Sequence, residues 1–133
     1  LAARWLFSGS VAWAGLAPDG TGLAAFLGHV FSPFLGFKGG KGVATALGVF
    51  LGLTPLSVLP AVVVFVAVTA LTGYISAGSL SGAAVVPLAA LCLSEPPRIL
   101  VLTVVLAAVI FLRHRENIAR LRRGEENKWR RKR

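Results

Sequence analysis

The sequence predicts an all-α fold: a polytopic transmembrane helical bundle of about five to six helices, some of them short or tilted. Apolar residues make up 56% of the chain, and the mean hydropathy of +0.77 lies far above that of a soluble domain. Between Val43 and Leu112 the only charged residues are Glu95 and Arg98. One helix needs about 20 apolar residues to cross a bilayer, so this much longer stretch must cross several times.

Turn-forming residues divide the apolar sequence into successive helices. An apolar segment precedes Pro18-Asp19-Gly20, and Thr54-Pro55 and Pro96-Pro97 mark two later boundaries. Glycine, hydroxyl residues and one tyrosine interrupt the sequence at residues 73–79. One apolar stretch before the lysines and four spans after them are expected at about residues 21–34, 43–53, 56–72, 80–93 and 98–112. Several are shorter than a full crossing, so tilted helices or partial crossings are expected.

Positive charge is concentrated at the end of the chain. Residues 113–133 carry ten Lys or Arg and three Glu, and so hold +7 of the net charge of +9. Such a basic run could bind nucleic acid. Beside a membrane span, however, the positive-inside rule and attraction to anionic lipid explain the run more simply. We therefore expect the lipid bilayer, and no nucleic acid, as a partner. Residues 1–133 are expected to form a single integral membrane domain with a cytoplasmic tail at 113–133.

The loop around Lys41 is a candidate phosphate cradle. It places two lysines among four glycines directly before an apolar, helix-forming stretch. Glycine permits tight turns, successive N–H groups of such a turn can surround an anion, and the following helix N-terminus adds more N–H groups. The nucleotide P-loop has a different glycine spacing and a Ser or Thr after its lysine. On spacing alone, a basic loop that snorkels between two membrane helices remains the alternative.

The start of the basic tail provides a second candidate cluster. If the last helix continues past the membrane, His114 and Asn117 are three residues apart and share a face. Glu116 and Arg120 are four apart, in the order that favours an ion pair on another face. His, Asn and arginine side chains at a membrane surface can hold a phosphorylated substrate by charge-assisted hydrogen bonds. An ordinary helix end, where Arg and His bind free carbonyls, is the alternative.

An even number of expected spans separates the lysine loop from the basic tail, so both are expected on the cytoplasmic side. The interruption at residues 73–79 falls on that side as well, and Glu95 falls on the opposite side. Three polar clusters are therefore expected to meet at one end of the bundle. Cys92 stands alone in an apolar segment, so the sequence indicates no disulfide within the chain and no paired-cysteine metal site.

Two runs carry a specific resemblance to a known family. Residues 28–45, GHVFSPFLGFKGGKGVAT, together with residues 114–121, HRENIARL, resemble the bacterial acyl-phosphate:glycerol-3-phosphate acyltransferases of the PlsY type. The run from Tyr74 to Ser79 resembles the serine loop that lies between these motifs in the family. The likeness covers essentially the whole chain and corresponds to the C-terminal two-thirds of a family member.

The resemblance implies a seven-helix enzyme of the bacterial inner membrane, without the family's N-terminal helix here. It implies transfer of a fatty acyl group from acyl phosphate to glycerol 3-phosphate, which gives lysophosphatidic acid and phosphate in the first step of phospholipid synthesis. It implies no metal and no organic cofactor. The residues that the motifs assign are Gly39, Gly40, Lys41 and Gly42 in the phosphate site, Ser79, His114 and Asn117 with Lys41 as catalytic groups, and His29, Lys38 and Arg115 as supporting groups.

One departure from the family concerns its N-terminal Ser-Gly-Asn motif, which contributes a serine and an arginine to the site. This chain has no such motif, begins at Leu1 and contains no methionine. An N-terminally truncated fragment is therefore expected, with its own activity left open. Two other classes are also left open: a small transporter or channel subunit whose basic loop gates an anion, and a membrane anchor whose tail binds anionic lipid.

Overall fold

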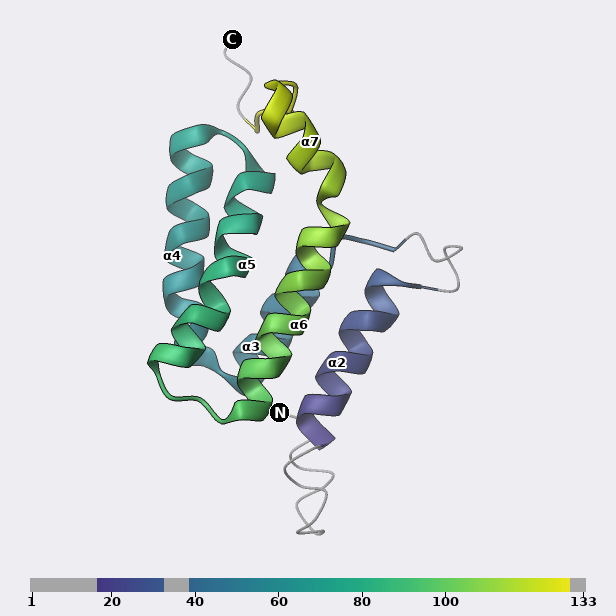
Figure 1. Cartoon of the computed structure of the whole chain (residues 1–133), viewed down its shortest axis with the longest axis vertical. Coiled ribbons are helices and arrows are strands. Elements are labelled where there is room, and N and C mark those ends of the chain that lie inside the picture. Colours follow the sequence, from purple (N-terminus) through teal and green to yellow (C-terminus); the bar gives the residue numbers. More distant parts are fainter. Residues whose placement is uncertain (1–16, 33–38, 130–133) are drawn as a thin grey trace.

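The computed structural model describes residues 17–32 and 39–129, and within them the chain forms six helices and no strand. The helices are α2 (Ala17–Val30), α3 (Val43–Leu53), α4 (Pro55–Thr72), α5 (Ile75–Cys92), α6 (Pro97–Arg113) and α7 (Arg115–Arg123). Figure 1 shows α2, α4, α5 and α6 side by side as the long members of one bundle, with α7 bent away at the C-terminal end. The predicted all-α bundle is confirmed.

Proline and glycine set most of the helix boundaries. Pro55 and Pro97 occupy the first turns of α4 and α6, where a missing N–H costs no hydrogen bond. Gly73 ends α4 with a φ of 79°, a left-handed conformation that glycine adopts without strain. The predicted interruption at residues 73–79 is wrong in extent, because only Gly73 and Tyr74 separate α4 from α5. The serines that follow lie inside the first turns of α5.

The α4–α5 pair is the most closely packed part of the fold. A Cβ atom at Gly78 would overlap Thr69 Oγ1 and lie 2.8 Å from the Phe65 carbonyl oxygen. A Cβ atom at Gly82 would lie 3.2 Å from the Ala61 oxygen. Two glycines one turn apart thus let the backbones of α4 and α5 approach closely, as small residues do in membrane helix pairs. This contact explains why the small-residue run continues as helix.

Polar groups at the end of the bundle opposite the lysine loop join its helices. Thr54 Oγ1, between α3 and α4, donates to Glu95 Oε1 at 2.6 Å, in the turn before α6. Arg98 Nε of α6 lies 3.2 Å from Asp19 Oδ2 of α2. Glu95 thus contacts Thr54, at the other end of α3 from the lysine loop, and its expected position on the opposite side of the membrane stays a prediction.

Within the described residues, α4 and α5 are each long and apolar enough to cross a membrane. Helices α6 and α7 reach that length only together, with a bend of 58° between them. Large apolar side chains of α4, such as Leu59, Val63 and Leu71, are exposed, as expected for a surface that faces lipid. Helix α3, with 11 residues, falls short of a full crossing, which fits the expectation of partial crossings.

The arrangement predicts how single cysteines will be labelled by a membrane-impermeant thiol reagent in a Cys92→Ser background. Ser32→Cys, beside the lysine loop, and Asn127→Cys, near the C-terminus, will be labelled from one side of the membrane. Ser94→Cys, in the turn between α5 and α6, will be labelled from the other side. Labelling of Ser32→Cys and Asn127→Cys from opposite sides would contradict the arrangement of the bundle.

Candidate active site

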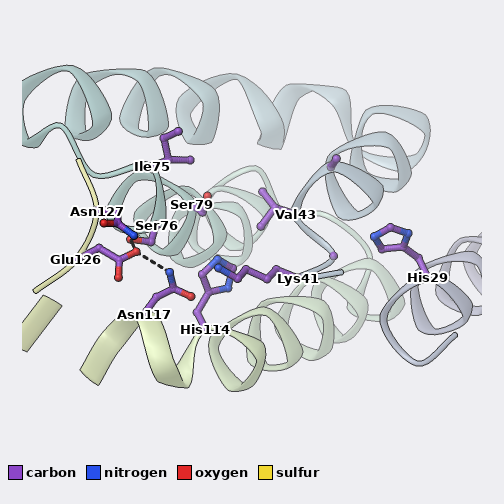
Figure 2. A pocket seen from close by; sticks show the side chains of 12 residues that line it. His29, Lys41, Val43, Ile75, Ser76, Ser79, His114, Asn117, Glu126 and Asn127 are labelled. Atoms are coloured by element: carbon purple, nitrogen blue, oxygen red, sulfur yellow. Dashed lines mark hydrogen bonds between the residues drawn. The ribbon is translucent and has the colours of Figure 1, made fainter. Parts of the chain in front are cut away.

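A cavity of about 390 Å³ opens at the end of the bundle where α7 begins. Figure 2 shows that its polar side chains come from several elements and converge on a common space. The cavity is lined by His29, Lys41, Gly42, Val43, Ala44, Ile75, Ser76, Ser79, His114, Asn117, Glu126 and Asn127. The predicted convergence of the lysine loop, the serines near residue 76 and the start of the tail at one end is thus confirmed.

Lys41 and the first turn of α3 form the cationic wall of the cavity. Gly42 is the N-cap of α3 and has a φ of 80°, which permits the sharp entry into the helix. No side chain among the described residues caps α3, and Val43 and Ala44 of its first turn line the cavity. The first N–H groups of a helix have no partners within it and favour an anion. In Figure 2 the Lys41 side chain extends from the loop toward His114, so its charge adds to this wall.

His114 lies in the bend between α6 and α7 and is only 2% exposed. Its Nδ1 lies 2.8 Å from the carbonyl oxygen of Ile110, one turn earlier. A carbonyl oxygen only accepts hydrogen bonds, so Nδ1 carries a proton and donates it there. In the neutral ring, Nε2 therefore holds the free lone pair and can accept a proton from a ligand. Asn117, on the first turn of α7, is also buried beside the cavity.

Two serines of α5 add hydroxyl groups to the lining of the cavity. Ser79 lines the cavity, as the sequence predicted, and so does Ser76, which the sequence analysis did not assign. The Oγ of Ser76 donates to Oε1 of Glu126 at 2.8 Å. Neither Ser76 nor Glu126 was assigned a role from the sequence, although Ser76 stands in the same hydroxyl-rich run as Ser79. Their pairing joins residues 50 positions apart and depends on the fold.

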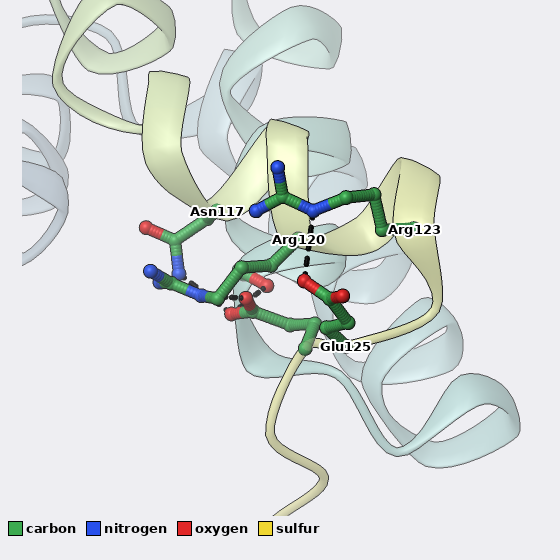
Figure 3. Close-up of polar contacts among 6 residues, drawn as sticks. Asn117, Arg120, Arg123 and Glu125 are labelled. Carbon is green, nitrogen blue, oxygen red and sulfur yellow. Dashed lines mark hydrogen bonds and ion pairs between the residues drawn. The ribbon is translucent and has the colours of Figure 1, made fainter.

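Glu126 accepts hydrogen bonds from three side chains, two of which, Asn117 and Arg120 of α7, are labelled in Figure 3. Besides the Ser76 hydroxyl it accepts hydrogen bonds from Asn117 Nδ2 at 2.6 Å and from Arg120 Nε at 2.7 Å. Burial alone raises the pKa of Glu126, but these three hydrogen bonds outweigh it and hold the pKa below its usual value. The expected pairing of Glu116 with Arg120 is wrong, because Arg120 pairs with Glu126 and Glu116 is exposed.

Gly39 and Gly40 pack against the end of α2 and do not line the cavity. A Cβ atom on Gly39 would overlap the carbonyl oxygen of His29 and lie 2.6 Å from that of Val30. A Cβ atom on Gly40 would have three atoms of the His29 ring as its nearest neighbours, with Nε2 at 2.5 Å. Arg113 Nη2 donates to the Gly39 oxygen at 2.7 Å and so ties the loop to the end of α6.

The supporting residues expected from the sequence occupy different positions. His29 is exposed at the edge of the cavity, and Figure 2 shows its ring well away from His114. Arg115 is exposed and does not line the cavity. Lys38 lies outside the described residues. Arg113, by contrast, contacts the loop directly, and its sequence signal was only its place at the start of the basic tail.

An apolar groove of about 260 Å³ adjoins the polar cavity. Val43 and Ser79 line both spaces, so the groove begins where the polar wall ends. Ala83 forms part of its lining, and Phe50 and Val58, which are almost fully buried, line it as well. Side chains of α3, α4, α5 and α6 contribute to the lining, and Leu47 and Val62 among them are exposed on the outer surface of the bundle. A hydrocarbon chain is the ligand that such a surface favours.

A membrane helical bundle with a cationic cavity beside an apolar groove defines a protein that can hold an amphiphilic, phosphorylated ligand. Residues 1–124 match the family model described as Glycerol-3-phosphate acyltransferase, and the chain belongs to this family. The resemblance noted in the sequence is thus confirmed.

Relatives with that name include a protein of Geobacter sulfurreducens, 56% identical over 108 residues that cover 81% of this chain and 56% of the relative. A protein of Geobacter metallireducens is 55% identical over 129 residues, which cover 97% of this chain and 64% of the relative. The chain therefore spans less than two thirds of the length of these relatives.

Solved structures of PlsY (YgiH), an integral membrane glycerol 3-phosphate acyltransferase, share the fold. Its glycerol 3-phosphate form superposes with a TM-score of 0.81 at 37% identity and covers 89% of this chain and 62% of that one. Its lysophosphatidic acid form gives the same TM-score and identity. The likeness confirms the integral membrane fold of this chain.

The packing of the two glycines predicts unequal effects of alanine. Gly39→Ala places a methyl group against backbone oxygens that cannot move aside, and we expect a loss of folded protein equivalent to about 1–3 kcal/mol. Gly40→Ala meets only a side-chain tip that can rotate away, so its unfolding midpoint will stay near that of the parent protein. Thermal unfolding in detergent measures both. A Gly40→Ala protein that is stable but loses all phosphate affinity would instead support the direct phosphate contact expected from the sequence.

Proposed function

We propose that this chain carries the active site of an acyltransferase that moves a fatty acyl group from acyl phosphate to glycerol 3-phosphate. The products are lysophosphatidic acid and inorganic phosphate. The observation that carries the proposal is the shared lining of the two spaces by Val43 and Ser79. A phosphate in the polar cavity and an acyl chain in the apolar groove then meet at one point, where an acyl–phosphate bond belongs.

The cationic wall suits the phosphate groups of both substrates. Lys41 supplies a full positive charge, and the first turn of α3 supplies N–H donors in the same wall. These groups are fixed before the ligand arrives, so they stabilise negative charge without reorganisation. The charge that develops on the departing phosphate is therefore balanced where the acyl–oxygen bond breaks. Among the described residues no three His, Cys, Asp or Glu side chains form a group that could hold a metal ion.

His114 can take the proton that the reaction releases. The primary hydroxyl oxygen of glycerol 3-phosphate attacks the acyl carbonyl carbon, a new ester bond forms, and the bond from that carbon to the phosphate oxygen breaks. The hydroxyl proton passes to Nε2 of His114, whose other nitrogen donates to the Ile110 carbonyl. The released phosphate can accept this proton instead of His114, and the reaction is balanced in either case. Acyl phosphate is already activated, so holding the two substrates together supplies much of the rate.

We also propose that the cavity faces the cytoplasm at the bacterial inner membrane. The basic tail supports this side, because short basic segments next to membrane spans favour the cytoplasm. The transporter and anchor alternatives gain less support. A transporter leads a polar path across the bundle, whereas the space that continues from the cavity is lined almost entirely by apolar side chains. An anchor requires no polar cavity at all.

Lys41→Ala will reduce kcat/KM by at least about a hundredfold, since removing one fixed donor or charge at a developing anion has effects of this size. Arg122→Ala is the matched control, because it removes the same charge from an exposed position on α7 and will change kcat/KM by less than about twofold. The measurement is phosphate release from acyl phosphate and glycerol 3-phosphate by the protein reconstituted in liposomes. Similar, mild losses of kcat/KM in both variants would mean that Lys41 acts only through a diffuse electrostatic attraction and not through a specific contact with phosphate.

Ala83→Leu will narrow the groove and shift the preference toward shorter acyl phosphates, by about fivefold in the ratio of kcat/KM for long and short chains. Ala84→Leu makes the same change at the next, exposed position of α5, which does not line the groove, and will leave the ratio unchanged. An unchanged ratio in Ala83→Leu would place the acyl chain elsewhere.

A further inference from the structure

The chain turns back toward the cavity after α7. Gly124 ends the helix with a φ of 71°, and residues 124–129, the return segment, run to the turn between α4 and α5. The backbone N–H of Trp129 donates to the Gly73 oxygen at 2.7 Å, and Lys128 Nζ lies 5.3 Å from the centre of the Tyr74 ring. Glu126 and Asn127, in the middle of the segment, line the cavity. The return segment is thus a wall of the polar site.

Glu126 holds three hydrogen-bond donors from three places in the chain. Its Oε1 accepts from Ser76 Oγ and Asn117 Nδ2, and its Oε2 accepts from Arg120 Nε. Its side chain is 7% exposed, so the contacts are largely shielded from water. Hydrogen bonds to an ionised group are stronger than those between neutral groups. The carboxylate therefore fixes both Ser76 and Asn117 in single orientations.

These orientations determine what the cavity offers to a ligand. An ionised carboxylate only accepts hydrogen bonds, so the amide nitrogen of Asn117 must face Glu126. The amide oxygen then points away from Glu126, and Figure 2 shows it on the side toward His114. Ser76 has already donated its only proton and can only accept further hydrogen bonds. Together with Nε2 of His114, these groups present hydrogen-bond acceptors to the cavity, whereas Lys41, which extends toward His114, presents a charged donor.

We propose that Glu126 is a positioning residue that sets this polarity, so that Asn117 and Ser76 accept hydrogen bonds from the hydroxyl groups of the acyl acceptor while Lys41 binds its phosphate. The proposal rests on the proposed function, since it assigns the glycerol end of glycerol 3-phosphate to the acceptor side. A polyol phosphate matches the cavity because it carries hydroxyl donors at one end and an anion at the other.

Glu126 itself is unsuited to act as the base. Both of its oxygens are occupied, and the donors that surround it hold its pKa below the usual value, which makes the carboxylate a weaker proton acceptor. Removal of its charge therefore acts through its neighbours. In Glu126→Gln the new amide group can donate as well as accept, so Asn117 is free to turn its nitrogen into the cavity. An Asn117 turned this way can only donate to the substrate hydroxyl, so the hydroxyl proton loses its acceptor and the hydroxyl is held in another orientation.

The test compares Glu126→Gln, Glu126→Asp and Ser76→Ala with the control Glu125→Gln, which removes an exposed charge paired with Arg123. Three quantities are measured on the reconstituted protein: KM and kcat for glycerol 3-phosphate, and the inhibition constant of inorganic phosphate. In detergent, the rise in unfolding midpoint caused by glycerol 3-phosphate is compared with the rise caused by inorganic phosphate. Inorganic phosphate has no carbon-bound hydroxyl groups, so its effect reports on phosphate binding by Lys41 alone.

We expect Glu126→Gln to raise KM for glycerol 3-phosphate about tenfold and to lower kcat, with phosphate inhibition unchanged. Glu126→Asp will recover part of the loss, Ser76→Ala will show a smaller increase in KM, and Glu125→Gln will match the parent protein. In Glu126→Gln, glycerol 3-phosphate and inorganic phosphate will raise the unfolding midpoint equally, because the added contribution of the glycerol hydroxyls is lost. An unchanged KM would assign Glu126 a structural role only. So would an equal loss of binding for glycerol 3-phosphate and for inorganic phosphate.

Three further outcomes are decided by the same data. If Glu126→Gln does not fold, Glu126→Asp and Ser76→Ala still decide, and the absence of a selective loss in both overturns the proposal. If the parent protein binds glycerol 3-phosphate better than phosphate but releases no phosphate from acyl phosphate, the acyltransferase function fails and the midpoint comparison still tests Glu126. If it binds glycerol 3-phosphate no better than phosphate, the proposal fails as well.

Discussion

The cost of placing a charge in hydrocarbon organises this structure. Within the described helices, charged groups are confined to the two ends of the bundle, where water and lipid headgroups are available. At one end Asp19 and Arg98 join α2 to α6. At the other, Lys41 and Glu126 meet around the cavity. Between the ends, Thr103 satisfies its hydroxyl on the Leu100 carbonyl of its own helix, at 2.7 Å. The lengths of the apolar helices thus decide where polar chemistry can gather.

Sequence reasoning located the parts of the site that depend on local signals. Lys41 stands before a helix start, and His114 and Asn117 stand three residues apart, so both clusters could be recognised without a structure. Their meeting at one end followed from counting helices. Glu126 could not be found this way, because its importance lies in contacts with Ser76, Asn117 and Arg120 that only the fold creates. The local rule that paired Glu116 with Arg120 failed because a buried partner with more donors competes better for the guanidinium.

The glycines show why a single motif can combine separate constraints. Gly42 is needed for its backbone angle, Gly39 for its closeness to α2, and Gly40 has space limited only by a histidine ring. The sequence presents them as one run, and a phosphate cradle explains the whole run equally well. Likewise, small residues near Gly78 favoured an interruption by composition, whereas the structure uses them to bring α4 and α5 together. A run of small residues indicates that the backbone approaches another group closely. Only the fold shows whether that group is a ligand or a neighbouring helix.

The return segment also ties the completion of the site to the order in which the chain is synthesised. Helices α2 to α6 leave the ribosome before residues 124–129 and can enter the membrane while that segment is still being made. The wall formed by Glu126 and Asn127 is added only when nearly the whole described chain has emerged. Until then Asn117 and Ser76 lack the carboxylate that orients them. Until residues 126 and 127 have been made, the nascent chain therefore holds a pocket with one wall missing and with Asn117 and Ser76 not yet held by the carboxylate.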